Sequence, residues 1–596
     1  MPSVTNDNSS SSRPRNLSWL VSRRFLCLRV TGAIASGLLL SAAFPPIEWD
    51  IMGWVFLLPL LCIAPPPGAG RRALLGYVFG LAHFLPSLAW LNEIGFAAGV
   101  LLALICGLFP MFWYIIVLRI IDVLAPASPP DAPPMPPSPP VAIAGALNQC
   151  MVALSAAAVW VALEWTRGWI FTGFPWNQIG VTQWRRLTLL QLTTVTGIFG
   201  LSFLLIAFNM AFGCTIYDWY RSFRLGKPSR RLSWPLGMVV ALLLPSLWIA
   251  SHAPRLPAPD QTLRVLAVQG NIPQCRAFTP EQLQLCFAVY MDLTRQGVPA
   301  TKPDLVVWPE TAIPAPLYHE QYRTLLGELL ADTQTPLLIG AVDFRRIPLT
   351  DEPDEDGERD DVRGFNSAFY IGTDGSVLDH YDKIHLVPFG EFTPFESYLP
   401  WLRDIIGMGR SLTPGREFTV LRLPNGARAG VNICFEDTFP GISRGFVIRG
   451  ANVLMTLTND AWYAESSGSR QHMLHTIFRA VEHRRPLFRS GNNSDTCLIL
   501  PNGRVTDLLE DPVTGDRFIR GSRTYSIPIW NNETLGMTFY TKHGDLFAQG
   551  CVLLTLAILC GLTYHWLRQK RRLFEVVTEK PQPPSSTSDG AEPRTT

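Results

Sequence analysis

Long apolar stretches, seven toward the start of the chain and one near its end, constrain the fold more than any other feature. A helix needs about 20 largely apolar residues to cross a bilayer. The first seven candidates lie at 25–44, 51–64, 72–92, 95–124, 141–170, 188–219 and 235–251. An eighth lies at 546–567. The second is short and the fourth to sixth are long, so tilted or interfacial ends are expected. These stretches predict a polytopic α-helical membrane bundle with eight spans.

Basic residues lie mostly on one side of these candidate spans, as is typical of cytoplasmic loops. Basic clusters precede the first span and follow the second, sixth and eighth, at 13–24, 71–72, 221–231 and 568–572. A Pro-rich loop at 125–140 follows the fourth span, and Arg185 and Arg186 run against the pattern. The alternation predicts five regions: a cytoplasmic tail at 1–24, a seven-span region at 25–251, a soluble domain outside the cytoplasm at 263–530, the eighth span at 546–567 and a disordered cytoplasmic tail at 568–596.

The segment 263–530 reads like an ordinary soluble domain in which short β-rich runs alternate with helical stretches. Strands are expected at 263–269, 304–308, 336–342, 367–371, 430–433, 452–457 and 497–500. Helices are expected at 280–296, 318–333 and 470–484. This alternation predicts an α/β domain with a mostly buried sheet. An acidic run at 351–361 is expected to be a solvated loop, because its carboxylates lack ordered ligand spacing.

Charge and cysteine usage exclude two kinds of function. The net charge is only +2, and no basic stripe with interleaved aromatic residues indicates nucleic-acid binding. The 11 cysteines form no CxxC pair and no Cys/His cluster with metal-ligand spacing. The sequence therefore predicts no metal and no cofactor, and most of the thiols are expected to be small buried apolar groups.

Three segments of the soluble domain carry residues suited to acyl transfer. Glu310 follows the apolar run Leu305–Trp308, and Lys383 lies in the segment Tyr381–Glu391. Cys434 ends a strand-like run and precedes a turn, where backbone N–H groups can receive an oxyanion. Each residue alone has a simpler interpretation: a surface acid, a solvated lysine or a packed thiol. Their combination is the informative feature.

The chemistry of these three residues favours a covalent mechanism. A thiol with a pKa of about 8.5 is mostly protonated at neutral pH and needs a base to act as a nucleophile. Glu310 can take that proton, and an apolar setting raises the pKa of a carboxyl toward this use. Lys383 can stabilise the thiolate and then the tetrahedral oxyanion, with a backbone N–H near Cys434 as a second donor. Cys434 would then carry the acyl group as a thioester.

The order Glu310, Lys383, Cys434, with gaps of 73 and 51 residues, is similar to the carbon–nitrogen hydrolase (nitrilase) superfamily, whose domain is an αββα sandwich. The segments Asn459–Trp462 and Arg485–Pro486 extend the match. Further motifs resemble the apolipoprotein N-acyltransferase family more narrowly: Gln269–Gln274, Phe389–Glu391 and the membrane motif Glu164–Trp176. The resemblance covers roughly residues 25–570.

This resemblance implies a donor, an acceptor and a location. The donor is a membrane phospholipid, and the acceptor is the N-terminal amine of the diacylglyceryl-cysteine of an apolipoprotein. Transfer through a Cys434 thioester would be the last step of lipoprotein maturation. The expected enzyme is a monomer in the bacterial inner membrane, with its catalytic domain on the periplasmic side and no nucleic-acid partner.

The resemblance also names supporting residues and shows departures. Glu391 and Glu436 match positions that support the site, either in a proton path or as charge partners that hold Lys383. Phe278 stands where the family usually has Trp, and Phe435 where it usually has Tyr. Both replacements keep an aromatic ring but lose a polar group. The segment 490–495 also departs from the family pattern, which leaves the donor preference open.

An aromatic segment at 389–408 follows Lys383 closely and contains Trp401. In a soluble domain such a segment would be a core helix with its lead-in. Here Pro394, Pro400 and the many aromatic residues favour a loop that dips into the membrane interface, where Trp and Tyr are preferred. Such an arm would guide an acyl chain to Cys434 and keep water from the thioester.

Two alternatives use the same features differently. A membrane-tethered amidase or nitrilase would use the same three residues with water as the acceptor, but it would not need the motif at 164–176 or eight spans. A transporter or lipid-binding scaffold with an inactive domain would be expected to show a series of charges within its spans. The spans lack such a series, and the three residues are all present.

Overall fold

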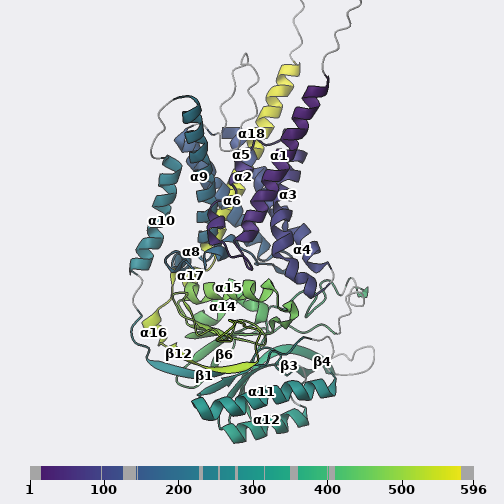
Figure 1. Cartoon of the computed structure of the whole chain (residues 1–596), viewed down its shortest axis with the longest axis vertical. Coiled ribbons are helices and arrows are strands. Elements are labelled where there is room, and N and C mark those ends of the chain that lie inside the picture. Colours follow the sequence, from purple (N-terminus) through teal and green to yellow (C-terminus); the bar gives the residue numbers. More distant parts are fainter. Residues whose placement is uncertain are drawn as a thin grey trace, which may run out of the picture.

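A computed structural model of the chain places a bundle of helices at one end of an elongated molecule and two sheets with their own helices at the other (Figure 1). It describes residues 15–95, 97–124, 143, 145–226, 233–252, 256–274, 279–313, 316–317, 319–348, 360–396, 398, 400–401 and 410–578. The Pro-rich loop at 125–140, residues 351–359 of the acidic run, Phe278 and the end of the chain after Thr578 lie outside these residues.

The helical end is a bundle of apolar helices. Its longer members are α1 (Arg15–Ala42), α3 (Ala69–Ser87), α4 (Ala98–Cys106), α5 (Leu108–Leu124), α6 (Ala146–Arg167), α9 (Phe199–Arg224), α10 (Trp234–His252) and α18 (Leu546–Thr578). Within the described residues, five segments are long and apolar enough to cross a membrane: Ala98–Leu124, Ala146–Arg167, Phe199–Arg224, Trp234–His252 and Leu546–Arg572. Helix α18 extends into the expected tail at 568–596.

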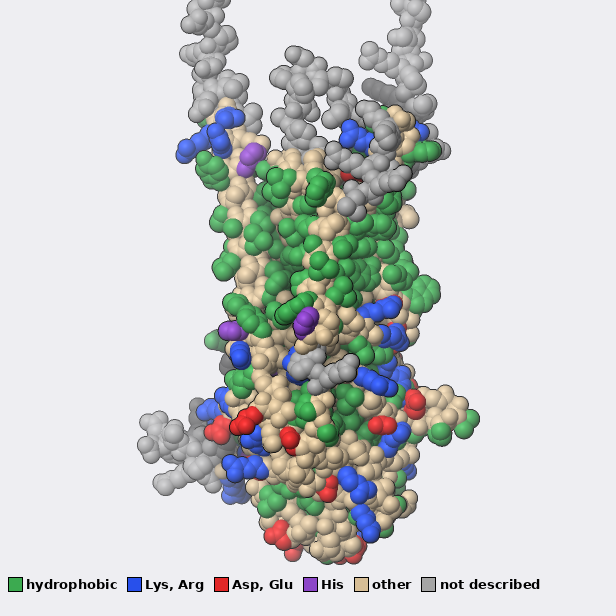
Figure 2. All heavy atoms as spheres, turned by 90° about the vertical axis from the view of Figure 1, so that its left-hand side faces the viewer, with side chains coloured by type: hydrophobic (Ala, Val, Ile, Leu, Met, Phe, Trp, Pro, Cys, Tyr) green, Lys and Arg blue, Asp and Glu red, His purple; other side chains and the backbone are tan. Residues whose placement is uncertain are grey.

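The surface of the bundle is suited to a lipid environment. On the face drawn in Figure 2, hydrophobic side chains cover the bundle, whereas acidic side chains gather over the end that holds the sheets. Helix α1 begins and α18 ends at the opposite end of the bundle, far from the sheets (Figure 1). Both ends of the described chain therefore lie on the side away from the sheets.

The expected second span at 51–64 is not a continuous helix. It forms the 3₁₀ helix η1 (Asp50–Trp54) and the four-residue α2 (Leu58–Leu61). Buried Asn209 of α9 accepts a hydrogen bond from the Leu57 amide (3.0 Å) and donates one to the Gly53 carbonyl (3.0 Å). Irregular backbone is tolerated at membrane depth where protein surrounds and satisfies it. The structure thus does not confirm eight regular spans.

Short helices join the longer elements along the chain. They are η2 (Ala89–Glu93), η3 (Ile170–Thr172), η4 (Ile179–Gln183), α7 (Leu187–Leu190), α8 (Thr193–Thr196), α16 (Asn532–Leu535) and α17 (Phe539–His543). Helices α8 and α17 lie at the level between the bundle and the sheets (Figure 1).

The other end of the molecule contains two six-stranded sheets. The first has the order β12 (Gly521–Ile529), β1 (Gln261–Gln269), β2 (Leu305–Val307), β3 (Leu337–Pro348), β4 (Asp360–Ile371) and β5 (Val377–Asp382). The second has the order β11 (Val505–Thr506), β10 (Cys497–Ile499), β9 (Leu487–Gly491), β8 (Val453–Thr458), β7 (Arg428–Ile433) and β6 (Val420–Arg422). Strands β1, β2 and β3 are parallel neighbours, as are β7, β8 and β9.

Alternating side chains on the strands build two layers of core. In β1, Val265 and Ala267 join the core shared with the second sheet, whereas Leu266 and Val268 pack with α11 (Pro280–Thr301) and α12 (Glu320–Thr333). This two-residue period is what a strand buried on both faces requires. Helices α11 and α12 lie at the far end of the molecule (Figure 1).

Helices α14 (Pro440–Ile448) and α15 (Ser467–His483) lie between the second sheet and the bundle (Figure 1). Every α15 residue from Gly468 to His483 except Arg470 is buried. The cluster of buried apolar residues runs without a break from the bundle into the two sheets. The helix layer that would face water in a free domain is here covered by the membrane part.

All seven expected strands and all three expected helices overlap elements of the structure. The sequence reasoning missed β5, β6, β9, β11 and β12. Strand β12 pairs antiparallel with β1 along all nine residues, which places the end of the domain beside its beginning. The sequence of β12 contains Gly521 and Pro528, and neither residue type is typical of a strand interior.

Candidate active site

Glu310, Lys383 and Cys434 come together where strands of both sheets end. Glu310 lies three residues beyond β2, Lys383 follows β5 directly, and Cys434 follows β7 directly. All three are buried, and the Lys383 Nζ lies 3.5 Å from the Glu310 Oε1. The charges of both residues act on the pKa of the Cys434 thiol. The structure thus gathers the three residues that the sequence singled out.

Cys434 occupies a strained turn. Its φ of 51° lies in the left-handed region, which a residue with a side chain adopts at a cost of about 1–2 kcal/mol. The short helix η5 (Cys434–Thr438) begins at this residue, and α14 follows it. Strain of this kind persists only where the surroundings hold the backbone, and it gathers at functional sites.

Glu310 is held by two donors on its two oxygens. The Asn366 amide donates to Oε1 (2.8 Å), and the backbone amide of Asn459 donates to Oε2 (2.8 Å). Burial raises the pKa of Glu310 above its ordinary value, Lys383 opposes the shift, and Glu391 adds to it. A carboxyl with a raised pKa is better matched to accepting a proton near neutral pH.

Lys383 is paired with Glu391 more closely than with Glu310. Its Nζ lies 2.9 Å from Glu391 Oε1, and Asn366 donates to that oxygen as well (2.7 Å). Burial alone would lower the pKa of Lys383, but the carboxylates of Glu391 and Glu310 outweigh it and raise the pKa. Lys383 therefore remains a cation. Of the two roles open for Glu391, its contacts favour that of a charge partner.

The resting nucleophile is a protonated thiol. Burial raises the pKa of Cys434 well above its ordinary value, and the charge of Glu310 raises it further, whereas Lys383 opposes the shift. A buried thiol of this kind reacts only when its proton moves to a base as the new bond forms. Glu310, whose charge acts on the pKa of this thiol, is the candidate for that base.

Glu436 acts on the backbone. Its Oε1 accepts hydrogen bonds from the Tyr381 hydroxyl (2.8 Å) and the amides of Ile384 (2.8 Å) and His385 (3.1 Å). Its Oε2 accepts from the amide of Ile433 (2.8 Å). Burial raises the pKa of Glu436 to about 7. The carboxyl ties the loop that carries Lys383 to the turn that carries Cys434, so Glu436 fixes their relative positions.

The three aromatic candidates are Phe278, Phe435 and Trp401, of which the structure describes the last two. The ring of Phe435 stacks on Trp176 and Phe174 of the membrane part, with centroids 6.1 and 6.4 Å apart. Trp401 is 54% exposed, which agrees with a surface arm rather than a core helix. Phe278 lies outside the described residues, as do residues 397, 399 and 402–408 of the arm.

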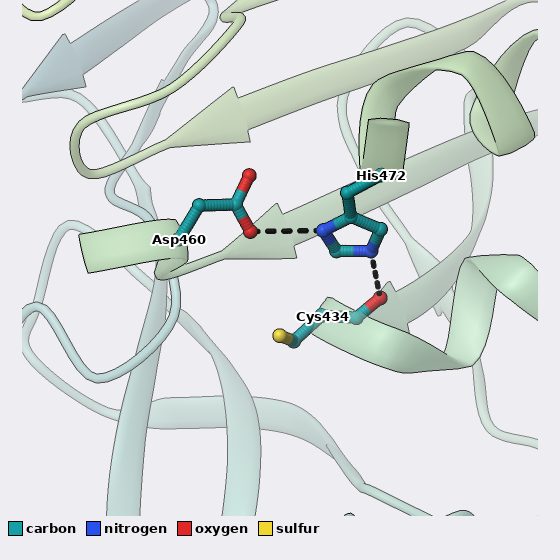
Figure 3. A group of neighbouring side chains, drawn as sticks. All are labelled: Cys434, Asp460 and His472. Atoms are coloured by element: carbon teal, nitrogen blue, oxygen red, sulfur yellow. Dashed lines mark hydrogen bonds and ion pairs between the residues drawn. The ribbon is translucent and has the colours of Figure 1, made fainter. Parts of the chain in front are cut away.

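Four buried charged residues beneath Cys434 were missed by the sequence reasoning: Asp437, Asp460, His472 and Arg489. Figure 3 shows the His472 ring between the Asp460 carboxylate and the main-chain oxygen of Cys434, with the sulfur pointing away from the ring. Asp460 was seen only as part of a family motif, and no pattern in the sequence distinguishes His472 from other helical histidines.

The Cys434, Asp460 and His472 ligand atoms lie close enough together to hold a metal ion, within 4.8 Å of one another. The charged side chains around these three residues do not suit a metal ion. Arg489 places its guanidinium 2.8 Å from both Asp460 and Asp437, so a cation already neutralises these carboxylates. A metal at this position would face the arginine at close range.

Comparisons with known proteins agree with the two-part architecture. Residues 36–211 match the family model described as apolipoprotein N-acyltransferase N-terminal domain, and residues 264–512 match carbon-nitrogen hydrolase. An apolipoprotein N-acyltransferase of Geobacter metallireducens is 32% identical over 529 residues, which cover 87% of this chain and 92% of that protein.

Two further relatives carry the same name. The Azotobacter vinelandii protein is 36% identical over 362 residues (60% of this chain, 65% of the relative), and the Vibrio vulnificus protein is 28% identical over 557 (91% and 97%). A mutant amidase of Nesterenkonia AN1 from the nitrilase superfamily has a TM-score of 0.32 and 15% identity, over 50% of this chain and 96% of that one. The two family models in chain order, with an identity that extends over 92% of the Geobacter relative, show that the chain belongs to the apolipoprotein N-acyltransferase family.

Proposed function

We propose that the protein transfers a fatty acyl group from a membrane phospholipid to the N-terminal amine of the diacylglyceryl-cysteine of apolipoproteins, through a thioester on Cys434. The observation that carries this proposal is the buried group of Glu310, Lys383 and Cys434 beside the apolar bundle. The names of the relatives supply the substrate class.

In the first half-reaction, the Cys434 sulfur attacks the ester carbonyl carbon of the phospholipid while the thiol proton moves to Glu310. Lys383 stabilises the oxyanion that forms, because its ammonium lies in a buried site where charge interactions are strong. The oxyanion collapses and the ester C–O bond breaks. The lysophospholipid leaves with the proton from Glu310, and the thioester remains on Cys434.

In the second half-reaction, the amine of the apolipoprotein attacks the thioester carbonyl carbon. Glu310 takes the proton that the amine loses as the C–N bond forms. Lys383 again holds the oxyanion, the C–S bond breaks, and the proton returns to Cys434. The enzyme is regenerated without a cofactor, and no net proton is gained or lost.

We further propose eight membrane crossings in the bacterial inner membrane, with residues 263–530 in the periplasm and both termini in the cytoplasm. The basic clusters of the sequence and the position of both described ends of the chain, away from the sheets, support this arrangement. The second crossing would be the irregular segment with η1 and α2. A monomer suffices, because one chain holds all three residues.

Mass spectrometry of the purified protein tests the mechanism. After incubation with phospholipid vesicles, a Cys434-containing peptide should carry a fatty acyl group that hydroxylamine removes, and Cys434→Ala should carry none. Adding a diacylglyceryl-cysteine peptide should discharge the thioester and yield an N-acyl peptide. Release of free fatty acid without amide would instead identify a membrane-tethered hydrolase.

A further inference from the structure

A closed network of four buried charges lies under the nucleophile. The His472 Nδ1 lies 2.8 Å from Asp460 Oδ1, and its Nε2 lies 2.9 Å from Asp437 Oδ1. Arg489 bridges the other oxygens of both carboxylates at 2.8 Å. The side chains of all four residues are 0% exposed. Two cations and two anions balance, as a group with no access to water requires.

The surroundings of His472 define its protonation. Acceptors face both ring nitrogens: the Asp460 carboxylate at Nδ1, and at Nε2 the Cys434 main-chain oxygen (3.2 Å) with the Asp437 carboxylate. Both nitrogens therefore carry hydrogen, although the Arg489 Nη2 also lies 3.1 Å from Nδ1. The pKa of His472 agrees: burial would lower it, but Asp437 and Asp460 raise it to about 9. An imidazolium with these partners has no free lone pair, so it cannot act as a base toward the thiol.

The hydrogen bond from Nε2 reaches the backbone of the nucleophile itself. Figure 3 shows the Cys434 carbonyl directed at the ring and the sulfur directed away from it. Because the peptide unit is planar and trans, a fixed Cys434 carbonyl also fixes the direction of the Phe435 N–H, which points the opposite way. The left-handed φ of Cys434 needs such support.

We propose that His472 is a positioning residue. Through its hydrogen bond to the Cys434 carbonyl, it holds the left-handed turn in the orientation that aims the Phe435 N–H at the developing oxyanion. This inference rests on the thioester mechanism proposed above. In the oxyanion site, Lys383 then supplies the positive charge, and the His472 network orients the backbone donor. Trp176 of the membrane part packs on the same imidazole, with centroids 5.4 Å apart.

Two substitutions at His472 separate its two hydrogen bonds. In His472→Asn, the side-chain amide can replace Nδ1 and keep Asp460, but it cannot reach the Cys434 carbonyl. In His472→Gln, the longer amide can replace Nε2 and keep that carbonyl. Both variants lose the positive charge equally. His475→Gln is the matched control, because His475 is a buried histidine of the same helix that packs on Trp176 and makes no hydrogen bond within the described residues.

Two rates are measured for each variant in the full-length protein. The first is thioester formation with vesicles of phosphatidylethanolamine and phosphatidylglycerol, and the second is alkylation of Cys434 by iodoacetamide. Alkylation displaces iodide and forms no oxyanion, so it reports the thiol alone. In His472→Asn, thioester formation should fall by about 10²-fold, the scale of losing one oxyanion donor, while alkylation stays close to wild type. His472→Gln should recover most of the loss, and His475→Gln should match wild type.

The outcomes separate this inference from the proposed function. A wild-type protein that forms no thioester would refute the function itself. If wild type forms the thioester and His472→Asn forms it equally fast, only the role of His472 is wrong. The same holds if His472→Asn and His472→Gln lose thioester formation and alkylation together, since that would be a general loss of structure.

If His472→Asn does not fold, Asp437→Asn provides the test. The groups that face the ring are Asp437, Asp460 and Arg489, with His475 one turn along α15. Removing the Asp437 carboxylate leaves His472 free to become neutral as the pH rises. The Asp460 carboxylate then keeps the single hydrogen on Nδ1, and Nε2 no longer donates to the Cys434 carbonyl. Thioester formation, relative to wild type, should then fall between pH 6 and 9. Parallel pH profiles for this variant and wild type would overturn the proposal.

Discussion

At the scale of single residues, Glu310 is the proton acceptor on which the mechanism depends. Glu310→Gln keeps the shape and one oxygen, so one of the two amides of Asn366 and Asn459 still finds an acceptor. The variant cannot take the thiol proton, however, and general-base catalysis is worth about 10²–10⁴-fold. We therefore expect single-turnover thioester formation to slow by that factor while the fold is kept. A variant that reacts within threefold of wild type would assign the base to another group.

The charge on His472 also predicts how stability depends on pH. Its pKa rises from 6.5 to about 9 in the folded protein, because Asp437 and Asp460 outweigh burial and Arg489. A raised pKa gives stability that is full below about pH 6.5 and is lost as the pH climbs to about 9. The thermal midpoint in detergent should fall over this range, and it should fall less in His472→Gln. Equal slopes for the two proteins would contradict a charged His472.

At the scale of elements, Asn209 of α9 stabilises the irregular segment between α1 and α3. It satisfies the Leu57 amide and the Gly53 carbonyl, which no helix or sheet pairs. Asn209→Ala leaves both groups buried without a partner, at a cost of about 2–6 kcal/mol for the two. We expect a clear drop in the thermal midpoint. Thr215→Val is the control, because the hydrogen bond of the Thr215 hydroxyl stays within α9. An equal drop of the thermal midpoint in both variants would show that Asn209 does not stabilise this segment.

The aromatic arm is a second element with a testable role. Tyr398 is 82% exposed and Trp401 is 54% exposed, although aromatic side chains usually bury much of their surface. If the arm lies in the lipid interface, replacing both with Ser should weaken transfer from vesicles and raise thioester hydrolysis relative to amide formation. Transfer from detergent-dispersed phospholipid should change little. Trp219→Ser, on the exposed end of α9, serves as the control. If the double variant transfers acyl groups from vesicles as well as wild type does, the arm has only a packing role.

At the scale of the whole molecule, the membrane part and the sheets share one core. Gln471 of α15 accepts hydrogen bonds from Trp90 (3.2 Å) and Trp176 (2.8 Å), and it donates to the carbonyls of Pro45 and Ser87. One amide thus joins three loops of the bundle to the helix that carries His472. The catalytic geometry and the membrane part are for this reason parts of a single structure.

The orientation of this structure in the membrane can be tested with two single-cysteine variants. Val513 is 91% exposed on the sheet end, and Arg571 is exposed near the end of α18 on the opposite side. In intact spheroplasts, a membrane-impermeant maleimide should label Val513→Cys but not Arg571→Cys. Permeabilised cells should show both labelled. Labelling of Arg571→Cys alone in intact spheroplasts would reverse the proposed topology.

The sequence by itself determined the class of the protein and its three central residues. Apolar length and basic clusters indicate a membrane bundle because the bilayer imposes both on any chain that crosses it. Glu310 and Cys434 were identifiable because each lies beside a strand-like run, and strand ends meet at one edge of a sheet. Lys383 was identifiable only through the resemblance in order and spacing, because its strand β5 was not predicted. The apolar spans, the basic clusters and the strand ends can be predicted because each is set by residues that are close together along the chain.

Only the tertiary structure decided the rest. The 51–64 segment was expected to be a span, yet Asn209, about 150 residues away, supplies the partners that let it remain irregular. Glu391 and Glu436 were indistinguishable in the sequence, but one pairs with Lys383 and the other binds four groups of the surrounding loops. The His472 network joins η5, η6 (Asp460–Tyr463), α15 and β9. No local pattern reveals such a site, because its energy comes from charges that meet only when distant segments exclude water together.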